Sequence, residues 1–187
     1  MKVGLEVRQS LDKLPCKLDI PVFLQAIEDC LRNRPTALAP ETAAQMLLDD
    51  LAQKNKREGE RFLAANAQRE GVQTTPSGLQ YAVLRPGSGP RPGPTDRVRI
   101  NYVGALLDGT EFDSTKQRGP AVYSVAGDNA LLDGVAEGVR LMSTGAVYQL
   151  FVPPDLAFGD QGALRLIGPS AVLIFEIELL EILPQLP

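Results

Sequence analysis

The chain changes its sequence pattern at Gly71, and this change limits how it can fold. Before Gly71, apolar residues recur every three or four positions, as they do along amphipathic helices. After Gly71, short β-prone segments are separated by turns rich in proline and glycine. The sequence therefore predicts an all-α segment over residues 1–71 and a domain of different architecture over residues 72–187.

Three helices are expected before Gly71. Apolar stripes run through residues 3–11 and 20–31, and Pro40 marks the start of a longer helix that continues to about Gly71. The two shorter helices bury too little apolar surface to remain folded alone, so they need a partner surface. In the long helix, residues 53–61 are polar on every face, which predicts a solvent-bathed spacer.

The residue composition disfavours several kinds of chemistry. The chain has no histidine and only two cysteines, so it lacks the usual general base and the commonest metal ligand. Metal-assisted hydrolysis and Ser-His or Cys-His catalysis are therefore not expected, and no cofactor or metal site is predicted. Cys30 lies about ten residues into its expected helix, roughly 15 Å along the axis, which is too far for a disulfide with Cys16.

The segment after Gly71 predicts an α+β domain. Residues 97–107 alternate, with Ile100 and Tyr102 on one face, and a hairpin turn follows at Asp108-Gly109. One short helix is expected over about residues 132–142. Further strands are expected at residues 79–84, 110–112, 122–125, 147–152 and 172–180. The predicted fold is an antiparallel sheet wrapped around one short helix.

Five groups of residues occur in the order found in one known family. They are Asn101–Gly104, Asp108–Ser114, Asp133–Gly138, Pro154–Gly159 and Phe175–Leu180. Over about residues 72–183 the chain resembles the FKBP-type peptidyl-prolyl cis-trans isomerases. Residues 60–64 and 75–81 resemble the bacterial Mip-like subgroup, whose N-terminal helices exchange between protomers. The resemblance implies an isomerase that assists protein folding, and a homodimer formed through residues 1–50.

The resemblance also implies roles for individual residues. Tyr102 and Phe112 would wall an apolar pocket for a proline ring, and Asp113 would lie beside the amide that rotates; these three form the implied catalytic set. Arg118 would pair with Asp113, and the backbone N–H of Leu132 would bind a substrate carbonyl. The other implied substrate-binding residues are Leu131, Val135, Phe158, Ile167 and Phe175. Considered singly, the aromatic residues would be ordinary core residues and Asp113 a turn cap, so only their joint match favours a site.

The pocket residues depart from the family pattern at four places. Val135 stands in place of a tryptophan, Phe158 of a tyrosine, Ala163 of a frequent histidine, and Gly168-Pro169 of a Pro-Pro pair. A loss of about 60 Å² of apolar contact at Val135 is worth about 1.5 kcal/mol, or roughly tenfold in rate. The missing hydroxyl at Phe158 adds about 1 kcal/mol. The sequence therefore predicts a slow isomerase, and the alternative is a dimeric chaperone or protein-binding module with little catalysis.

The implied partners are proline-containing or unfolded polypeptides, and a macrolide is a candidate ligand. The net charge is −4 with acids and bases interspersed, so nucleic acid is not an expected partner. No apolar run is long enough to predict a membrane span. As the sequence stands we expect a cytoplasmic protein, or a periplasmic one if an export signal has been removed.

Overall fold

The computed structural model describes residues 25, 28–29, 32, 40–127, 129–163 and 166–183. Two compact units divide the chain, Met1–Gln53 and Lys54–Pro187. Helix α3, Pro40–Asn66, contributes its first residues to one unit and its remaining residues to the other. The second unit therefore begins inside α3, whereas the sequence pattern places the boundary after residue 71.

The expected N-terminal helices are only partly covered by the description. The helix expected at residues 3–11 lies outside the described residues, and within residues 20–31 the described positions 25, 28 and 29 are helical. The long helix begins at Pro40 as expected but ends at Asn66 rather than near Gly71. It ends there because the chain turns: the Arg69 N–H donates to the Asn66 carbonyl at 3.0 Å, which is a tight-turn contact instead of the next helical one.

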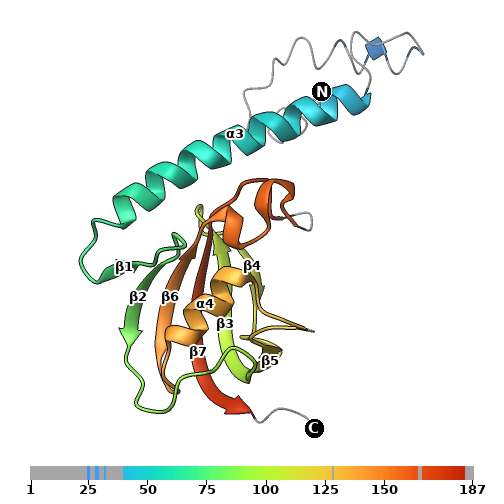
Figure 1. Ribbon diagram of the computed structural model, residues 1–187. Coiled ribbons are helices and arrows are strands. Elements are labelled where there is room, and N and C mark those ends of the chain that lie inside the picture. The colour runs from blue at the N-terminus through green and yellow to red at the C-terminus, as the bar shows by residue number, and fades with distance from the viewer. Residues whose placement is uncertain are drawn as a thin grey trace. The chain divides into compact units, whose positions relative to one another are not determined.

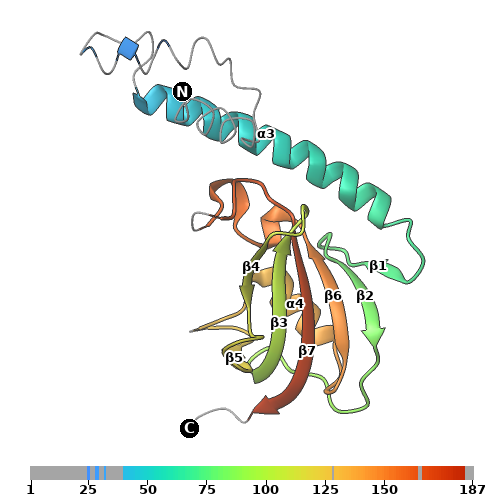
Figure 2. The same cartoon turned by 180° about the vertical axis from the view of Figure 1, so that it is seen from behind.

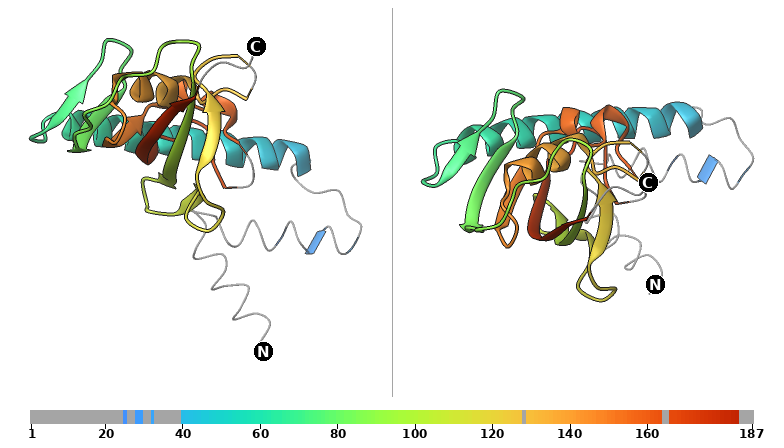
Figure 3. Two further views of the ribbon diagram at one scale, coloured as in Figure 1. Left: turned by 90° about the horizontal axis from the view of Figure 1, so that it is seen from below. Right: turned by 60° about the horizontal axis from the view of Figure 1, so that its bottom comes forward.

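An antiparallel sheet of seven strands forms the body of the second unit within the described residues (Figures 1 and 2). Its strands are β1 (Val72–Thr74), β2 (Gln80–Arg85), β3 (Arg97–Leu106), β4 (Glu111–Ser114), β5 (Ala121–Ser124), β6 (Val147–Val152) and β7 (Leu173–Leu183). Their order is β1-β2-β6-β7-β3-β4, and β5 pairs with β3. The two longest strands, β3 and β7, are neighbours at the centre and lie side by side in Figure 3.

Helix α4, Asp133–Leu141, packs closely against one face of this sheet (Figure 1). Two glycines on α4 permit the close approach. A Cβ atom at Gly134 would lie 2.5 Å from Val152 Cγ1, and one at Gly138 would lie 2.4 Å from Leu150 Cδ1. Because β6 supplies both neighbours, the helix is seated directly on the sheet, and the predicted α+β fold with a sheet wrapped around one helix is confirmed.

The alternation predicted for β3 is also confirmed. Val98, Ile100 and Tyr102 are buried, whereas Arg97 and Arg99 on the opposite face are not. Consecutive side chains of a strand point to opposite faces, so the core-facing set of β3 points toward α4. This register brings Tyr102 to the side of the sheet where the site forms.

The second half of α3 is not a solvent-bathed spacer. Gly59 is buried, and a Cβ atom there would lie 2.7 Å from Val172 Cγ2. The rings of Phe62 and Phe151 have centroids 5.7 Å apart. The expectation failed because the docking face consists largely of a glycine and amide side chains, which do not form an apolar stripe.

A buried hydrogen-bond network fixes the end of α3. The Asn66 amide donates to Gln80 Oε1 at 2.8 Å, and the Gln80 amide donates to the Leu63 carbonyl at 2.9 Å. Arg69 donates to Asn66 Oδ1 at 2.9 Å. Buried amides are stable only when they are paired, so the helix end and β2 depend on each other.

Candidate functional site

A cavity of about 180 Å³ lies between α4 and the sheet and is lined mainly by apolar side chains. The lining residues are Ile100, Tyr102, Phe112, Asp113, Tyr123, Ala130, Leu131, Leu132, Val135, Phe158, Phe175 and Ile177. Ile100, Val135 and Ile177 are almost completely buried, so they form the floor of this cavity. A hollow of this size and polarity can take a small apolar ring away from water.

Most of the residues implied by the sequence resemblance come together here. Eight of them line the cavity: Tyr102, Phe112, Asp113, Leu131, Leu132, Val135, Phe158 and Phe175. Arg118 does not line it but contacts Asp113 from the side. Ile167 is buried in the core and exchanges backbone hydrogen bonds with Ala163 at 3.0 Å, so it supports the loop beside the cavity without forming its wall.

Two of the aromatic walls meet because Gly104 has no side chain. The ring centroids of Phe112 and Phe175 are 5.7 Å apart and nearly perpendicular, at 85°. Gly104 pairs with Asp113 of β4 and with Phe175 of β7. A Cβ atom at Gly104 would lie 2.7 Å from Phe112 Cζ and 2.9 Å from Phe175 Cε1. The glycine therefore sets the distance at which the two rings form one wall.

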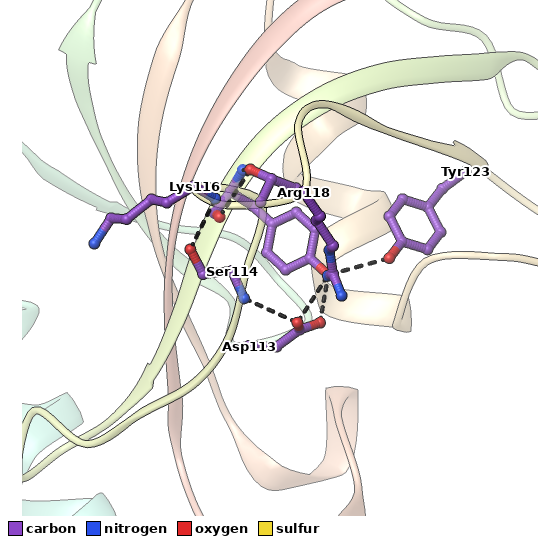
Figure 4. A network of polar contacts seen from close by, with 7 residues as sticks. Asp113, Ser114, Lys116, Arg118 and Tyr123 are labelled. Atoms are coloured by element: carbon purple, nitrogen blue, oxygen red, sulfur yellow. Dashed lines mark hydrogen bonds and ion pairs between the residues drawn. The ribbon is translucent and has the colours of Figure 1, made fainter.

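A polar network closes the rim of the cavity (Figure 4). The Tyr102 hydroxyl donates to Asp113 Oδ2. Asp113 Oδ1 accepts from Arg118 Nη2 at 2.7 Å and from the Ser114 N–H at 2.8 Å. Both carboxylate oxygens are therefore occupied, which makes Asp113 a fixed negative charge and a poor proton acceptor.

The number of hydroxyl protons determines which tyrosine donates in the contact between Tyr102 and Tyr123. Arg118 Nη2 also donates to the Tyr102 oxygen, at 2.5 Å, and the hydroxyl oxygens of Tyr102 and Tyr123 are 3.1 Å apart. Tyr102 has a single hydroxyl proton, and Asp113 accepts it. Tyr123 must therefore donate to Tyr102. The sequence reasoning missed Tyr123, and an aromatic residue in the short β-prone segment at residues 122–125 was its only signal.

The protonation states of Tyr102 and Asp113 at the rim do not depend on pH near neutrality. Burial raises the pKa of the Tyr102 hydroxyl far above its usual value, and the hydrogen bonds with Asp113 and Tyr123 act in the same direction. Burial alone would raise the pKa of Asp113, but the hydrogen bonds from Tyr102, Arg118 and the Ser114 N–H outweigh it and lower the pKa. Tyr102 therefore stays neutral and Asp113 stays charged over the physiological range.

The start of α4 offers a backbone donor at the cavity. Leu132 is the residue that precedes α4, and its carbonyl accepts from the Ala136 N–H at 2.8 Å. The Leu131 N–H donates to the Ser124 carbonyl at 3.0 Å. No described residue accepts a hydrogen bond from the Leu132 N–H. This donor is thus available to a carbonyl group that enters the cavity.

Comparison with known proteins identifies the family and the fold. The family model for FKBP-type peptidyl-prolyl cis-trans isomerase matches residues 89–180, and that for the domain amino terminal to it matches residues 1–83. The chain belongs to the FKBP family. An FKBP-type isomerase named FkpA from Aeromonas hydrophila is 38% identical over 200 residues, covering 97% of this chain and 73% of the relative.

Two further relatives support this assignment. The FKBP-type 22 kDa peptidyl-prolyl cis-trans isomerase of Escherichia coli is 38% identical over 193 residues, covering 97% of this chain and 92% of the relative. The crystal structure of FkpA from Escherichia coli matches with a TM-score of 0.69 and 29% identity, covering 98% of this chain and 92% of that chain. The matched relatives also include proteins named Mip, so the resemblance to FKBP and Mip-like proteins is confirmed across both parts of the chain.

Among the described residues, no helix is long and apolar enough to cross a membrane. No cluster of acidic and cysteine side chains among these residues could hold a metal ion.

Proposed function

We propose that this FKBP chain is a peptidyl-prolyl cis-trans isomerase. Its rate is reduced because Val135, at the floor of the pocket, offers a prolyl ring less apolar contact than a tryptophan would. The observation that carries the proposal is the apolar cavity with Tyr102, Phe112 and Phe175 on its walls and Asp113 at its rim. The substrate class is a polypeptide that presents an accessible proline. Catalysis of this kind needs no histidine, metal or covalent intermediate.

The chemistry follows from the electronic structure of the amide bond. Its partial double bond gives a rotation barrier of about 18–20 kcal/mol, and water supports the planar form by solvating its separated charges. Transfer of the Xaa-Pro amide into the cavity removes that solvation, and better binding of the twisted amide lowers the barrier further. The Leu132 N–H would hold a substrate carbonyl, while the fixed charge of Asp113 lies beside the rotating bond.

Substitution at Val135 tests the proposed cause of the low rate. Val135→Trp should raise kcat/KM for an Ala-Leu-Pro-Phe peptide up to about tenfold, because about 60 Å² of new apolar contact is worth about 1.5 kcal/mol. Val135→Ala should lower kcat/KM, since alanine offers the prolyl ring less apolar contact than valine. A wild-type rate above buffer is required for either comparison. A Val135→Trp rate equal to wild type would show that the floor does not limit catalysis.

The rate should not change with pH between about pH 5 and pH 9, because the charge states of Asp113 and Tyr102 stay constant there. The lowered pKa of Asp113 keeps it ionised throughout this window. Its contribution to stability is present above its unfolded-state pKa and is lost only as pH falls through the lowered folded value. The raised pKa of Tyr102 keeps that hydroxyl protonated up to alkaline pH. A pH–rate profile measures this, and a bell-shaped curve within the window would contradict the account.

We also propose that the chain forms a homodimer through residues 1–50 and acts on unfolded polypeptides as a two-pocket chaperone. Support comes from α3, where Met46, Leu47 and Leu48 are 57%, 46% and 50% exposed. Three consecutive large apolar residues at such exposure are typical of a contact surface. Two weak pockets on one dimer would bind a long client more tightly than either pocket alone.

A further inference from the structure

Helix α3 contacts the segment that joins β6 to β7, residues 153–172. The Asn55 amide donates to the Pro169 carbonyl at 2.8 Å, across 114 positions of sequence. One helical turn later, Gly59 packs on Val172. The same segment contains two single-turn helices, Pro154–Leu156 and Gly159–Gln161. It also carries Phe158, a cavity-lining residue that lies outside the strands and α4.

Ser170 connects this contact to Phe158. Its hydroxyl donates to Asp160 Oδ1 at 2.6 Å and its N–H donates to the Gly159 carbonyl at 2.9 Å. Gly159 directly follows Phe158 in the chain. From Asn55, two hydrogen bonds and the peptide bonds between them therefore reach the residue beside the pocket wall.

The backbone at Ser170 needs to be held in place. Its φ angle is +54°, a left-handed conformation that is unfavourable for a residue with a side chain. Ser170 is only 4% exposed, so its polar groups depend on protein partners. A strained, buried residue keeps its shape when surrounding contacts enforce it, and the bond from Asn55 to the adjacent Pro169 carbonyl is one of those contacts.

We propose that Asn55 and Gly59 are positioning residues for the pocket: by docking on residues 169–172, α3 holds the segment that places Phe158 on the cavity. This inference rests on the proposed function, because the pocket is taken to bind a prolyl ring. The polar residues at the rim, Tyr102 and Asp113, lie on β3 and β4 and not on this segment. Loss of the docking contact should therefore weaken substrate binding more than it slows the isomerisation of bound substrate.

Asn55→Ala tests the proposal in the full chain, with Lys56→Ala as its control. Lys56 is an exposed neighbour on the same helix. Asn55→Ala should raise KM for the Ala-Leu-Pro-Phe peptide about fivefold, as expected for a hydrogen bond of about 1 kcal/mol, and leave kcat nearly unchanged. Lys56→Ala should leave both constants unchanged. The ring NMR signals of Phe158, assigned with Phe158→Leu, should shift in Asn55→Ala without peptide present.

Gly59→Ala supplies an independent test through packing. In an undocked helix this substitution would be neutral or stabilising, because alanine favours the helix. The new methyl group meets Val172 Cγ2 at 2.7 Å, so the Val172 side chain must move. Val172 is buried, so we expect this movement to displace the segment, weaken peptide binding and shift the Phe158 signals. Adding Val172→Ala to Gly59→Ala creates room for the methyl group and should restore both measurements toward those of Val172→Ala alone.

The outcomes separate this inference from the proposed function. A wild-type chain that neither binds nor isomerises the peptide would refute the proposed function, and the Phe158 signals would still decide whether α3 positions that wall. Asn55→Ala with wild-type KM and unshifted Phe158 signals would overturn the inference. A lower melting temperature in Asn55→Ala with unshifted Phe158 signals would overturn it as well, since Asn55 would then serve stability alone.

Discussion

Gly104→Val should reduce isomerisation to the buffer rate and lower the free energy of unfolding by about 1–3 kcal/mol, the usual range for an overpacked core. Valine suits a β-strand, so the backbone of β3 does not oppose the change. The conflict lies with the rings, since even a Cβ atom would lie within 3 Å of both Phe112 and Phe175. The two rings must separate, and the wall of the pocket opens or collapses into the cavity.

The neighbouring residue provides the control for Gly104→Val. Ala105→Val adds two methyl groups at the next position of β3, on the opposite face of the sheet. It should leave the isomerisation rate unchanged. The stability of Gly104→Val should recover in part when Phe112→Leu is added, because leucine is shorter than the ring that meets the new side chain. Wild-type stability and activity in Gly104→Val would refute the assigned role of this glycine.

Removal of residues 1–71 should destabilise the FKBP domain by about 2–6 kcal/mol relative to a chain that starts at Lys54. Loss of the Phe62 ring uncovers Phe151, worth about 1–3 kcal/mol. The buried Gln80 side chain loses both Asn66 and the Leu63 carbonyl, worth about 1–3 kcal/mol more. Stabilities of domains are typically about 5–15 kcal/mol, so the shorter chain loses a large share.

Urea unfolding of the two truncated chains measures this difference. The chain beginning at Lys54 is the matched control, since it keeps every contact of the second compact unit. Equal midpoints for the two chains would contradict the docking of α3. Light scattering on the same samples examines the dimer proposal: the full chain should have the mass of two protomers and the chain from Lys54 the mass of one.

The sheet and most of the pocket were predictable from the sequence because their signals are local. Val98, Ile100 and Tyr102 alternate with the polar residues Arg97, Arg99 and Asn101 along β3, and that period of two fixed which side chains reach the core. The motif residues from Asp113 to Phe175 come from strands, from α4 and from the connections between them, and the order of the motifs indicated that they would meet. The ion pair of Arg118 with Asp113, 2.7 Å in the structure, was expected on the same basis.

The docking of α3 was not predictable because Phe62 is the one large apolar side chain named in its contacts, and the rest of the docking face does not form an apolar stripe. Asn55, Gly59 and Asn66 form a face recognised by hydrogen bonding and close approach, and hydrophobic periodicity does not detect such a face. Ile167 was implied as a substrate-binding residue, but it is buried, does not line the cavity and forms a backbone bridge with Ala163. Ile100 and Ile177 fit the pattern of ordinary core residues, so the sequence did not mark them as lining residues, yet they line the cavity together with Val135.

The central claim is that the cavity receives a prolyl ring and lets its amide rotate. NMR exchange spectroscopy on an Ala-Leu-Pro-Phe peptide, with and without the full chain, measures this directly. We expect cis-trans exchange faster than in buffer at micromolar protein, and a return to the buffer rate in Phe112→Ala, which removes one wall of the cavity. Exchange at the buffer rate with the wild-type chain at high concentration would contradict the account.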